Sequence, residues 1–250
     1  PLIDDGLMPN LQGLISRGAM GNISTLEPIL SPMLWNSIAT GKLADKHGVL
    51  GFTEPDPING GVRSVASTSR RTKALWNMLS QSDMRSIVVN WWASYPAEPI
   101  EGCIVSNAYA NAKWEDGRGW KYPVGTFHPR SIADEVSGLR VHSREIDQQS
   151  ILPFIPKAGE IDQDSDRRLE VFADQLAHCA SVQSAATHLM ATKPWDMAAV
   201  YLEGIDHFCH SFMEYHPPRM PHIREEDFEI YKDVISGAYR FHDMMLGSLL

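Results

Sequence analysis

The sequence predicts an α/β protein with a mostly parallel central sheet that helices cover on both faces. Short apolar segments at 85–92, 102–107 and 195–206 are typical of buried strands, since none is long enough for a core helix. A long helical pattern at 165–191 precedes the last of them. Helices that alternate with apolar strands are typical of a parallel sheet covered on both faces.

Local signals define the other elements in chain order. Proline near the start and Gly18 after the last turn mark the first helix, and Gly41 ends the second. Glycine, proline and aspartate dominate 44–63, which predicts a loop, and 107–165 is irregular and rich in aromatic residues. The predicted helices are 9–17, 31–40, 72–81, 129–137, 165–191 and a last one from 231 onward, and the predicted strands are 20–25, 85–92, 102–107 and 195–206.

Composition and charge narrow the classes of function. The 250 residues are 43% hydrophobic and 21% charged, which is typical of a globular protein. The formal net charge is −9 and no basic run offsets it, so a nucleic-acid partner is not expected. No apolar run is long enough to span a membrane. The three cysteines are widely spaced and indicate no disulfide framework.

Both ends of the sequence lack the signals that normally bound a domain. The chain begins without methionine or a leading strand, and a helical pattern continues to Leu250 without a glycine or proline stop. We therefore expect residues 1–250 to be an internal fragment of one larger domain, truncated at both ends. Localisation is left open, because a targeting segment would lie outside such a fragment.

Ser31 has two interpretations. It precedes Pro32 and an apolar run, which is the pattern of a helix N-cap followed by proline at the first helical position. It is also placed to be a nucleophile, because a helix N-terminus presents free backbone N–H groups and a positive dipole end to a phosphate. The two roles are compatible.

A second group of chemically active side chains follows the last predicted strand. Ligands collect beyond the carboxyl ends of strands in open α/β sheets, and Asp206 and His210 lie there. Their i, i+4 spacing places both on one face of a helix, and their oxygen and nitrogen atoms suit Zn²⁺ or Mn²⁺. His207 forms a competing pair with His210, but we expect it to support the ligands or lie at the surface. Cys209 is expected to pack.

The two groups together resemble the type I phosphodiesterase/nucleotide pyrophosphatase group of the alkaline phosphatase superfamily. That group's pattern of Ser/Thr, Trp, Thr-Gly and His-Gly is matched by Ser31, Trp35, Thr40-Gly41 and His47-Gly48. The run GIDHFCH is similar to the group's Asp-x-x-x-His motif, which binds one of two metal ions. The resemblance covers 1–55 and 196–215 and implies one alkaline-phosphatase-like catalytic domain.

The resemblance also implies a mechanism. The protein would be a metal-dependent phosphohydrolase that cleaves phosphate mono- or diesters through a covalent seryl-phosphate intermediate. Ser31 would attack phosphorus and, bound to one of two divalent ions (zinc, with manganese as the alternative), would form an alkoxide near neutral pH. Asp206 and His210 would bind one ion, with further ligands outside 1–250. We expect His47 to be a buried histidine that fixes its turn.

Departures from the family pattern bear on the substrate. The run after Ser31 lacks the later proline and the arginine of sulfatases, so sulfatase chemistry is not expected. Phe52 stands where nucleotide pyrophosphatases have an asparagine after His-Gly, which leaves monoesters, other diesters or a phosphomutase-like transfer open. The alternatives are a phosphomutase or phosphotransferase with the same nucleophile, and a non-catalytic binding protein on this fold.

The expected partner is a small-molecule phosphate ester, whose binding residues the sequence does not identify. The irregular stretch 107–165 is a candidate cap or insertion over the site, because long loops in compact domains often bind or cover ligands. Its aromatic residues would line an apolar leaving-group pocket or form a separate packing cluster; they are Trp114, Trp120, Tyr122 and Phe127.

Overall fold

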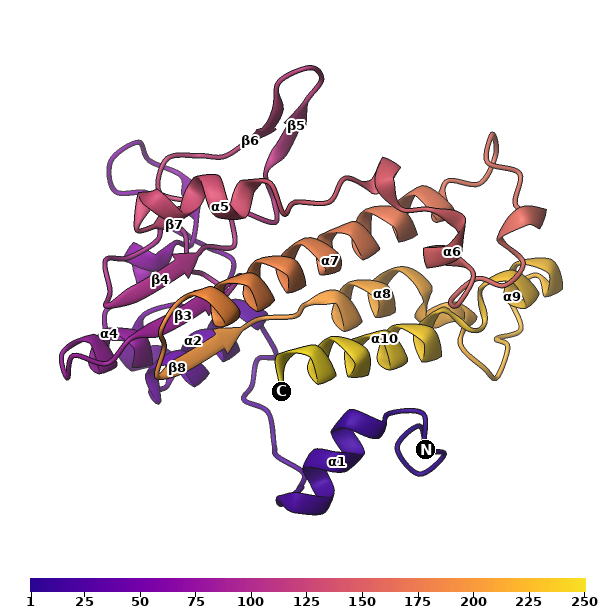
Figure 1. Cartoon of the computed structure of the whole chain (residues 1–250), viewed down its shortest axis with the longest axis horizontal. Helices are drawn as coiled ribbons and strands as arrows, with labels where there is room; N and C mark the ends of the chain where they lie inside the picture. Colours follow the sequence, from indigo (N-terminus) through magenta and orange to yellow (C-terminus); the bar gives the residue numbers. More distant parts are fainter. The chain divides into compact units, whose positions relative to one another are not determined.

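A computed structural model describes residues 1–250 and divides them into two compact units. The first unit contains Pro1–Gly21, Arg140–Gln183 and Leu202–Leu250, and the second contains Asn22–Leu139 and Ser184–Tyr201. Figure 1 follows the chain through both. The protein is α/β, as predicted: the first unit is helical, and the second is built around a small mixed sheet.

The main sheet lies in the second unit and has four strands in the order β7-β4-β3-β8. The strands β3 (Ser86–Val89), β4 (Gly102–Val105) and β8 (Met197–Val200) run parallel, and β7 (Phe127–His128) pairs with β4 in the antiparallel direction. Most side chains of β3 and β4 are β-branched or otherwise apolar, and all of β3 is buried. Burial on both faces explains why these segments are apolar throughout rather than alternating.

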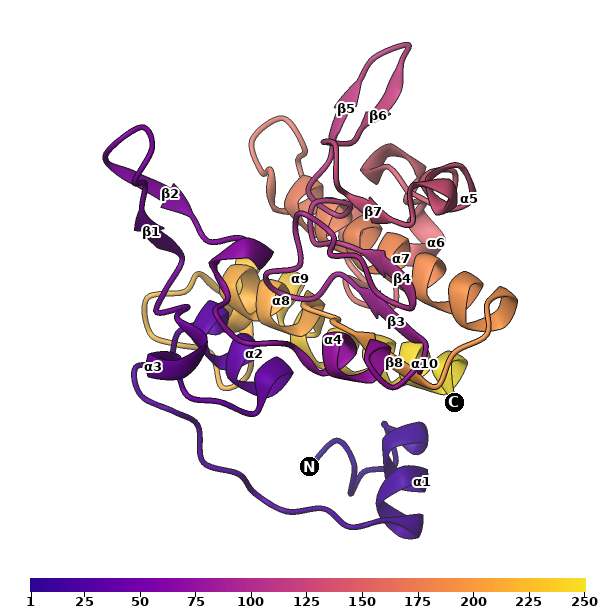
Figure 2. The same ribbon diagram turned by 90° about the vertical axis from the view of Figure 1, so that its left-hand side faces the viewer.

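Two antiparallel hairpins extend from the second unit (Figure 2). One joins β1 (Thr53–Pro55) to β2 (Val62–Ser64), and the other joins β5 (Lys113–Glu115) to β6 (Gly119–Lys121). The prediction of a plain loop at 44–63 was therefore wrong, because its glycines serve the turn of a hairpin. Gly60 and Gly61 adopt positive φ there, a conformation that other residues rarely reach.

The predicted strand at 20–25 was also wrong. These residues are irregular, and the apolar side chains of Met20 and Ile23 are exposed. This segment has no partner strand in either the main sheet or the hairpins. A strand needs such a partner for its backbone hydrogen bonds, so these residues do not form one.

An aromatic cluster holds the helices of the second unit on its sheet. Trp35 lies 4.4 Å from Tyr201 and 5.3 Å from Trp91, and Trp91 lies 5.9 Å from Trp76, measured between ring centroids. Edge-on and tilted ring pairs of this kind stabilise a core beyond simple burial. The helices of this unit are α2 (Ser31–Thr40), α3 (Ala44–His47), η1 (Ser67–Ser69), α4 (Leu75–Ser80), η2 (Arg130–Ile132) and α5 (Ala133–Ser137).

The first unit is built from helices around a phenylalanine-rich core. Phe154, Phe172, Phe208 and Phe212 are buried within one cluster, and α8 packs against α10 (Figure 1). The helix α7 continues into the second unit at residue 184. The helices are α1 (Pro9–Arg17), η3 (Ser143–Glu145), α6 (Gln148–Ile151), η4 (Ala158–Glu160), α7 (Arg168–Thr192), α8 (Gly204–Phe212), η5 (Met213–Tyr215), α9 (Glu225–Tyr231) and α10 (Val234–Leu249).

A buried carboxylate from α10 satisfies the N-terminus of α1. Asp243 accepts the backbone N–H groups of Asn10 and Leu11 at 3.0 and 2.8 Å, and the Asn10 side chain donates to it at 3.0 Å. The first N–H groups of a helix have no partner within the helix, and α1 has no side-chain cap of its own. Asp243, more than two hundred positions away in the sequence, therefore caps the N-terminus of α1 in place of a neighbouring side chain.

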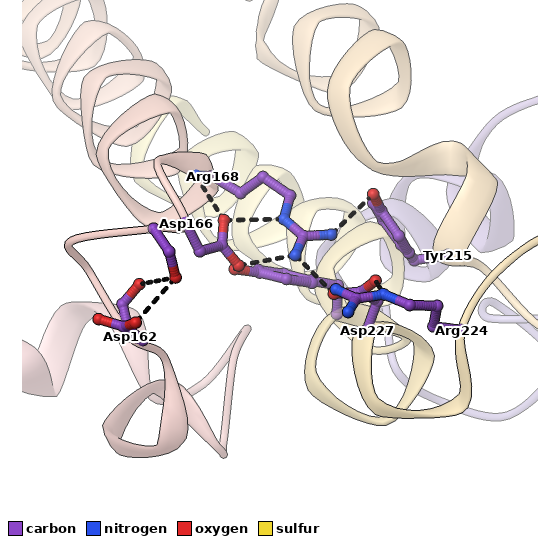
Figure 3. Close-up of polar contacts among 8 residues, drawn as sticks. Asp162, Asp166, Arg168, Tyr215, Arg224 and Asp227 are labelled. Carbon is purple, nitrogen blue, oxygen red and sulfur yellow. Dashed lines mark hydrogen bonds and ion pairs between the residues drawn. The ribbon is translucent and has the colours of Figure 1, made fainter.

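An arginine-centred network joins the start of α7 to α9 (Figure 3). The Arg168 guanidinium donates to Asp166 at 2.7 and 2.8 Å, to Asp227 at 2.5 Å and to the Tyr215 hydroxyl at 2.9 Å. Tyr231 lies under the guanidinium at 4.5 Å and donates its own hydroxyl to Asp166 at 2.8 Å. Hydrogen bonds from Arg168 lower the pKa of Asp166 to about 2.

Candidate active site

Ser31 is the first residue of α2, and Leu30 occupies the N-cap position. No side chain caps this helix, so the N-cap interpretation of Ser31 was wrong. The helix begins one residue earlier than the Ser-Pro pattern suggested, which places the hydroxyl inside the first turn, where it cannot accept a capping bond. The Ser31 side chain is partly exposed.

The start of α2 offers a favourable environment for an anion. The helix has ten residues, Pro32 lies in its first turn, and no acidic side chain occupies that turn. Unpaired N–H groups and the positive end of the helix dipole therefore face the region around Ser31. Asn36 fixes this turn from inside the unit, because its buried amide donates to the Pro32 carbonyl at 2.8 Å.

His47 is fully buried at the end of α3, and its hydrogen bonds define its tautomer. The backbone N–H of Val49 donates to Nδ1 at 3.1 Å, so in the neutral ring Nε2 carries the proton and donates to the Ser37 hydroxyl at 3.0 Å. Burial, and then the charge of Arg70, lowers the pKa of His47. The prediction of a buried histidine that fixes its turn is confirmed.

Asp206 and His210 lie on one face of α8, as their spacing predicted. The Asp206 Oδ2 and His210 Nε2 atoms are 3.6 Å apart, and their side chains are 60% and 78% exposed. One carboxylate oxygen and one imidazole nitrogen, both open to solvent and directed together, fit a divalent zinc or manganese ion as part of a ligand set. No third histidine, cysteine, aspartate or glutamate completes a metal-binding group around them.

The neighbouring side chains of α8 have different surroundings. His207 turns towards Glu203, with 3.8 Å between its Nε2 and Oε2 of the carboxylate. Cys209 is partly buried against the core, as predicted, and burial raises the pKa of its thiol. The contact between Glu203 and His178 was not predicted from the sequence. The only signal was a charged residue at the end of an apolar segment, which does not identify a partner on another helix.

The candidate residues belong to different units. Ser31 and His47 lie in the second unit, whereas Asp206 and His210 lie in the first. Ser31 lies in the first turn of α2, and Asp206 and His210 share one face of α8. The assignment of all three of Ser31, Asp206 and His210 to one reaction stays a prediction.

The aromatic residues of 107–165 pack mainly against one another. Trp114 and Trp120 face each other across the β5–β6 hairpin at 5.2 Å, and Tyr122 lies 5.1 Å from Phe127. The stretch is shared between the units, with 107–139 in the second and 140–165 in the first. Its roles as a cap or as an aromatic leaving-group pocket stay predictions.

The fold and these side chains define an α/β protein with a serine at one helix start and a carboxylate–imidazole pair on another helix. The family model for type I phosphodiesterase / nucleotide pyrophosphatase matches residues 1–250, the whole of the chain. The chain belongs to this family, and it is a hydrolase of phosphoester bonds. Comparisons with curated proteins and with solved structures returned no match. None of its helices combines the length and apolar character that a membrane span requires.

Proposed function

We propose that the protein is a metal-dependent phosphohydrolase that cleaves phosphate mono- or diesters through a covalent phosphate ester on Ser31. The observation that carries this proposal is the position of Ser31 in the first turn of α2, where the hydroxyl caps nothing. Membership of the phosphodiesterase family supports the reaction class. Three parallel strands in the main sheet are consistent with a mostly parallel sheet of the alkaline-phosphatase type.

The proposed reaction has two displacements at phosphorus. The Ser31 oxygen forms a bond to phosphorus while the bond to the leaving alcohol breaks, and the alcohol departs with a proton. Water then forms the new bond to phosphorus and releases the serine oxygen, which regains its proton. Backbone N–H groups at the start of α2 hold the phosphate oxygens through both displacements.

We propose Asp206 and His210 as ligands of one of two divalent ions, with Ser31 also in contact with an ion. Their exposure, their separation of 3.6 Å and their donor atoms support this assignment. Divalent ions, when bound, supply positive charge that lowers the pKa of a hydroxyl and offsets the phosphate. The chain carries a net charge of −9, and bound metal ions are the usual source of the local positive charge that a phosphate substrate needs in an acidic protein.

Substitution of Ser31 by alanine tests the proposal. Ser31→Ala should reduce turnover of an activated phosphate ester to background and abolish phosphate labelling of the protein, detected by mass spectrometry after an acid quench. The matched control is Ser37→Ala on the same helix, whose hydroxyl contacts His47, and this variant should keep its turnover. Near-normal turnover by the Ser31→Ala variant would exclude the serine as nucleophile.

A further inference from the structure

The first turn of α8 is closely enclosed on the side away from the proposed metal ligands. A Cβ atom at Gly204 would lie 2.2 Å from the Cys179 sulfur on α7 and 2.8 Å from the His242 ring on α10. Only glycine allows the helix backbone to come this close to both neighbours. The rotation of this turn about the helix axis is therefore set by contacts with α7 and α10. The same rotation decides where Asp206 and His210 point.

A largely buried carboxylate lies at the same junction. Glu203, the residue before α8, is only 12% exposed, and its Oε1 lies 2.7 Å from Nε2 of His178, which is 16% exposed and belongs to α7. The two atoms are within hydrogen-bonding distance, although the ring N–H is not aligned with this oxygen. The other carboxylate oxygen faces His207, whose ring is 5.8 Å from that of His178. Glu203 thus lies between one imidazole of α7 and one of α8.

The position of this carboxylate constrains α8 for two physical reasons. Imidazole N–H groups stabilise a largely buried carboxylate, so Glu203 favours the arrangement in which His178 and His207 lie beside it. Negative charge is also favourable at the N-terminus of a helix, and Glu203 immediately precedes the first turn. Both effects weaken if the turn rotates away from α7.

We propose that Glu203 and His178 are positioning residues for the metal-binding face of α8. By holding the rotation of the first turn, they direct Asp206 and His210 towards the same divalent ion. The inference rests on the proposed function, because it assumes that these two side chains bind metal. Groups that orient metal ligands without touching the metal typically contribute 10- to 100-fold to affinity.

A double-mutant cycle on metal affinity tests the proposal. Mn²⁺ binding to the protein is measured by electron paramagnetic resonance for the wild type, Glu203→Ala, His178→Ala and the double variant. Each single variant should bind Mn²⁺ about 10-fold more weakly, and the double variant should be no weaker than either single one, because the two residues act as a pair. His178→Gln, which keeps an N–H donor, should recover part of the affinity. Circular dichroism of each variant verifies that it is folded.

The matched control is another carboxylate paired with a histidine of α7. Glu135 and His188 are 3.5 Å apart in the second unit, away from α8 in sequence. Glu135→Ala and His188→Ala should leave Mn²⁺ affinity within about twofold of the wild type, the range expected for sites that share no partner.

The outcomes separate this inference from the proposed function. If Asp206→Asn leaves Mn²⁺ affinity unchanged, the proposed metal site itself fails. If Asp206→Asn weakens binding but the Glu203 and His178 variants bind like the control pair, the positioning role is wrong. Fully additive losses from Glu203→Ala and His178→Ala would overturn their action as a pair.

Discussion

Arg168 in the first unit and Arg70 in the second each contact an aromatic ring and pair with acidic side chains, Arg168 with two and Arg70 with one, and their hydrogen bonding differs. Arg168 is 28% exposed and donates to two carboxylates and a tyrosine hydroxyl (Figure 3). Arg70 is 1% exposed, yet it pairs with only one carboxylate, that of Glu98, and its Nη1 is buried without a hydrogen-bond partner. The more deeply buried arginine is therefore the less completely satisfied.

The difference shows that burial alone does not measure what a charged side chain contributes. Removing Arg168 would leave Asp166 and Asp227 close together in a partly buried site. Removing Arg70 would leave Glu98 with the Trp76 indole N–H, which donates to it at 3.1 Å. The free energy of unfolding should therefore depend on the partners left behind more than on the arginine's own exposure.

The two units can be monitored separately, which makes this comparison measurable. All seven tryptophans lie within 22–139 and 184–201, so tryptophan fluorescence reports the second unit. Hydrogen exchange of peptides from α8 and α10 reports the first unit.

The largest effect is expected from Arg168→Met. Methionine keeps much of the side-chain volume over Tyr231 but removes the charge, so the first unit should lose about 3 kcal/mol of unfolding free energy. Urea unfolding followed by hydrogen exchange measures the loss. Arg167→Met is the control, because Arg167 forms only a surface ion pair with Glu170. This substitution should lower the free energy of unfolding by less than about 0.5 kcal/mol. Equal losses in the two variants would contradict the role assigned to the network.

Acid should weaken the same network. The folded pKa of Asp166 is about 2, below its ordinary value of 3.8, chiefly because Arg168 donates to it. A carboxyl group with a lowered folded pKa stabilises the fold above its unfolded pKa, and that contribution disappears as pH falls from 3.8 through 2. The first unit should lose about 2 kcal/mol over this range. In Tyr231→Phe, which removes one donor to Asp166, the acid-dependent loss should be smaller.

A smaller effect is expected from Arg70→Met in the second unit. The substitution removes an unpaired buried donor together with the ion pair, and Trp76 continues to donate to Glu98. The loss should be about 1 kcal/mol, measured by tryptophan fluorescence during urea unfolding. If Arg70→Met lowers the free energy of unfolding as much as Arg168→Met does, the burial of the arginine determines the loss at both sites, rather than the partners left behind.

The smallest effect concerns His47 and a different pH range. Burial, and then the charge of Arg70, lowers its folded pKa, so the unfolded chain binds the proton more readily. The second unit should therefore lose stability as pH falls below about 6.5, well above the range in which Asp166 titrates. His47→Gln should flatten the pH dependence of the urea midpoint between pH 7.5 and 5, followed by tryptophan fluorescence. An unchanged slope would exclude His47 as its source.

Local patterns predicted those elements whose signals lie within a few residues. Gly41 ends α2 with a positive φ of 64°, as a glycine after the last turn indicated. The apolar runs became β3, β4 and β8, each shorter than its predicted segment. The predicted strand at 20–25 failed because no other strand pairs with it. The predicted loop at 44–63 failed although the signal was local, because its glycines form the turn of a hairpin between 53–55 and 62–64.

The sequence by itself determined the α/β class, the family and the chemical types of the candidate site residues, including the shared face of Asp206 and His210. These features depend on periodicity and on motifs that span fewer than twenty residues. The tertiary structure decided which carboxylate satisfies the start of α1, which acids surround Arg168, and which imidazole approaches Glu203. These contacts join residues brought together by helix packing, and the energy of a charged group depends on the neighbours that packing supplies.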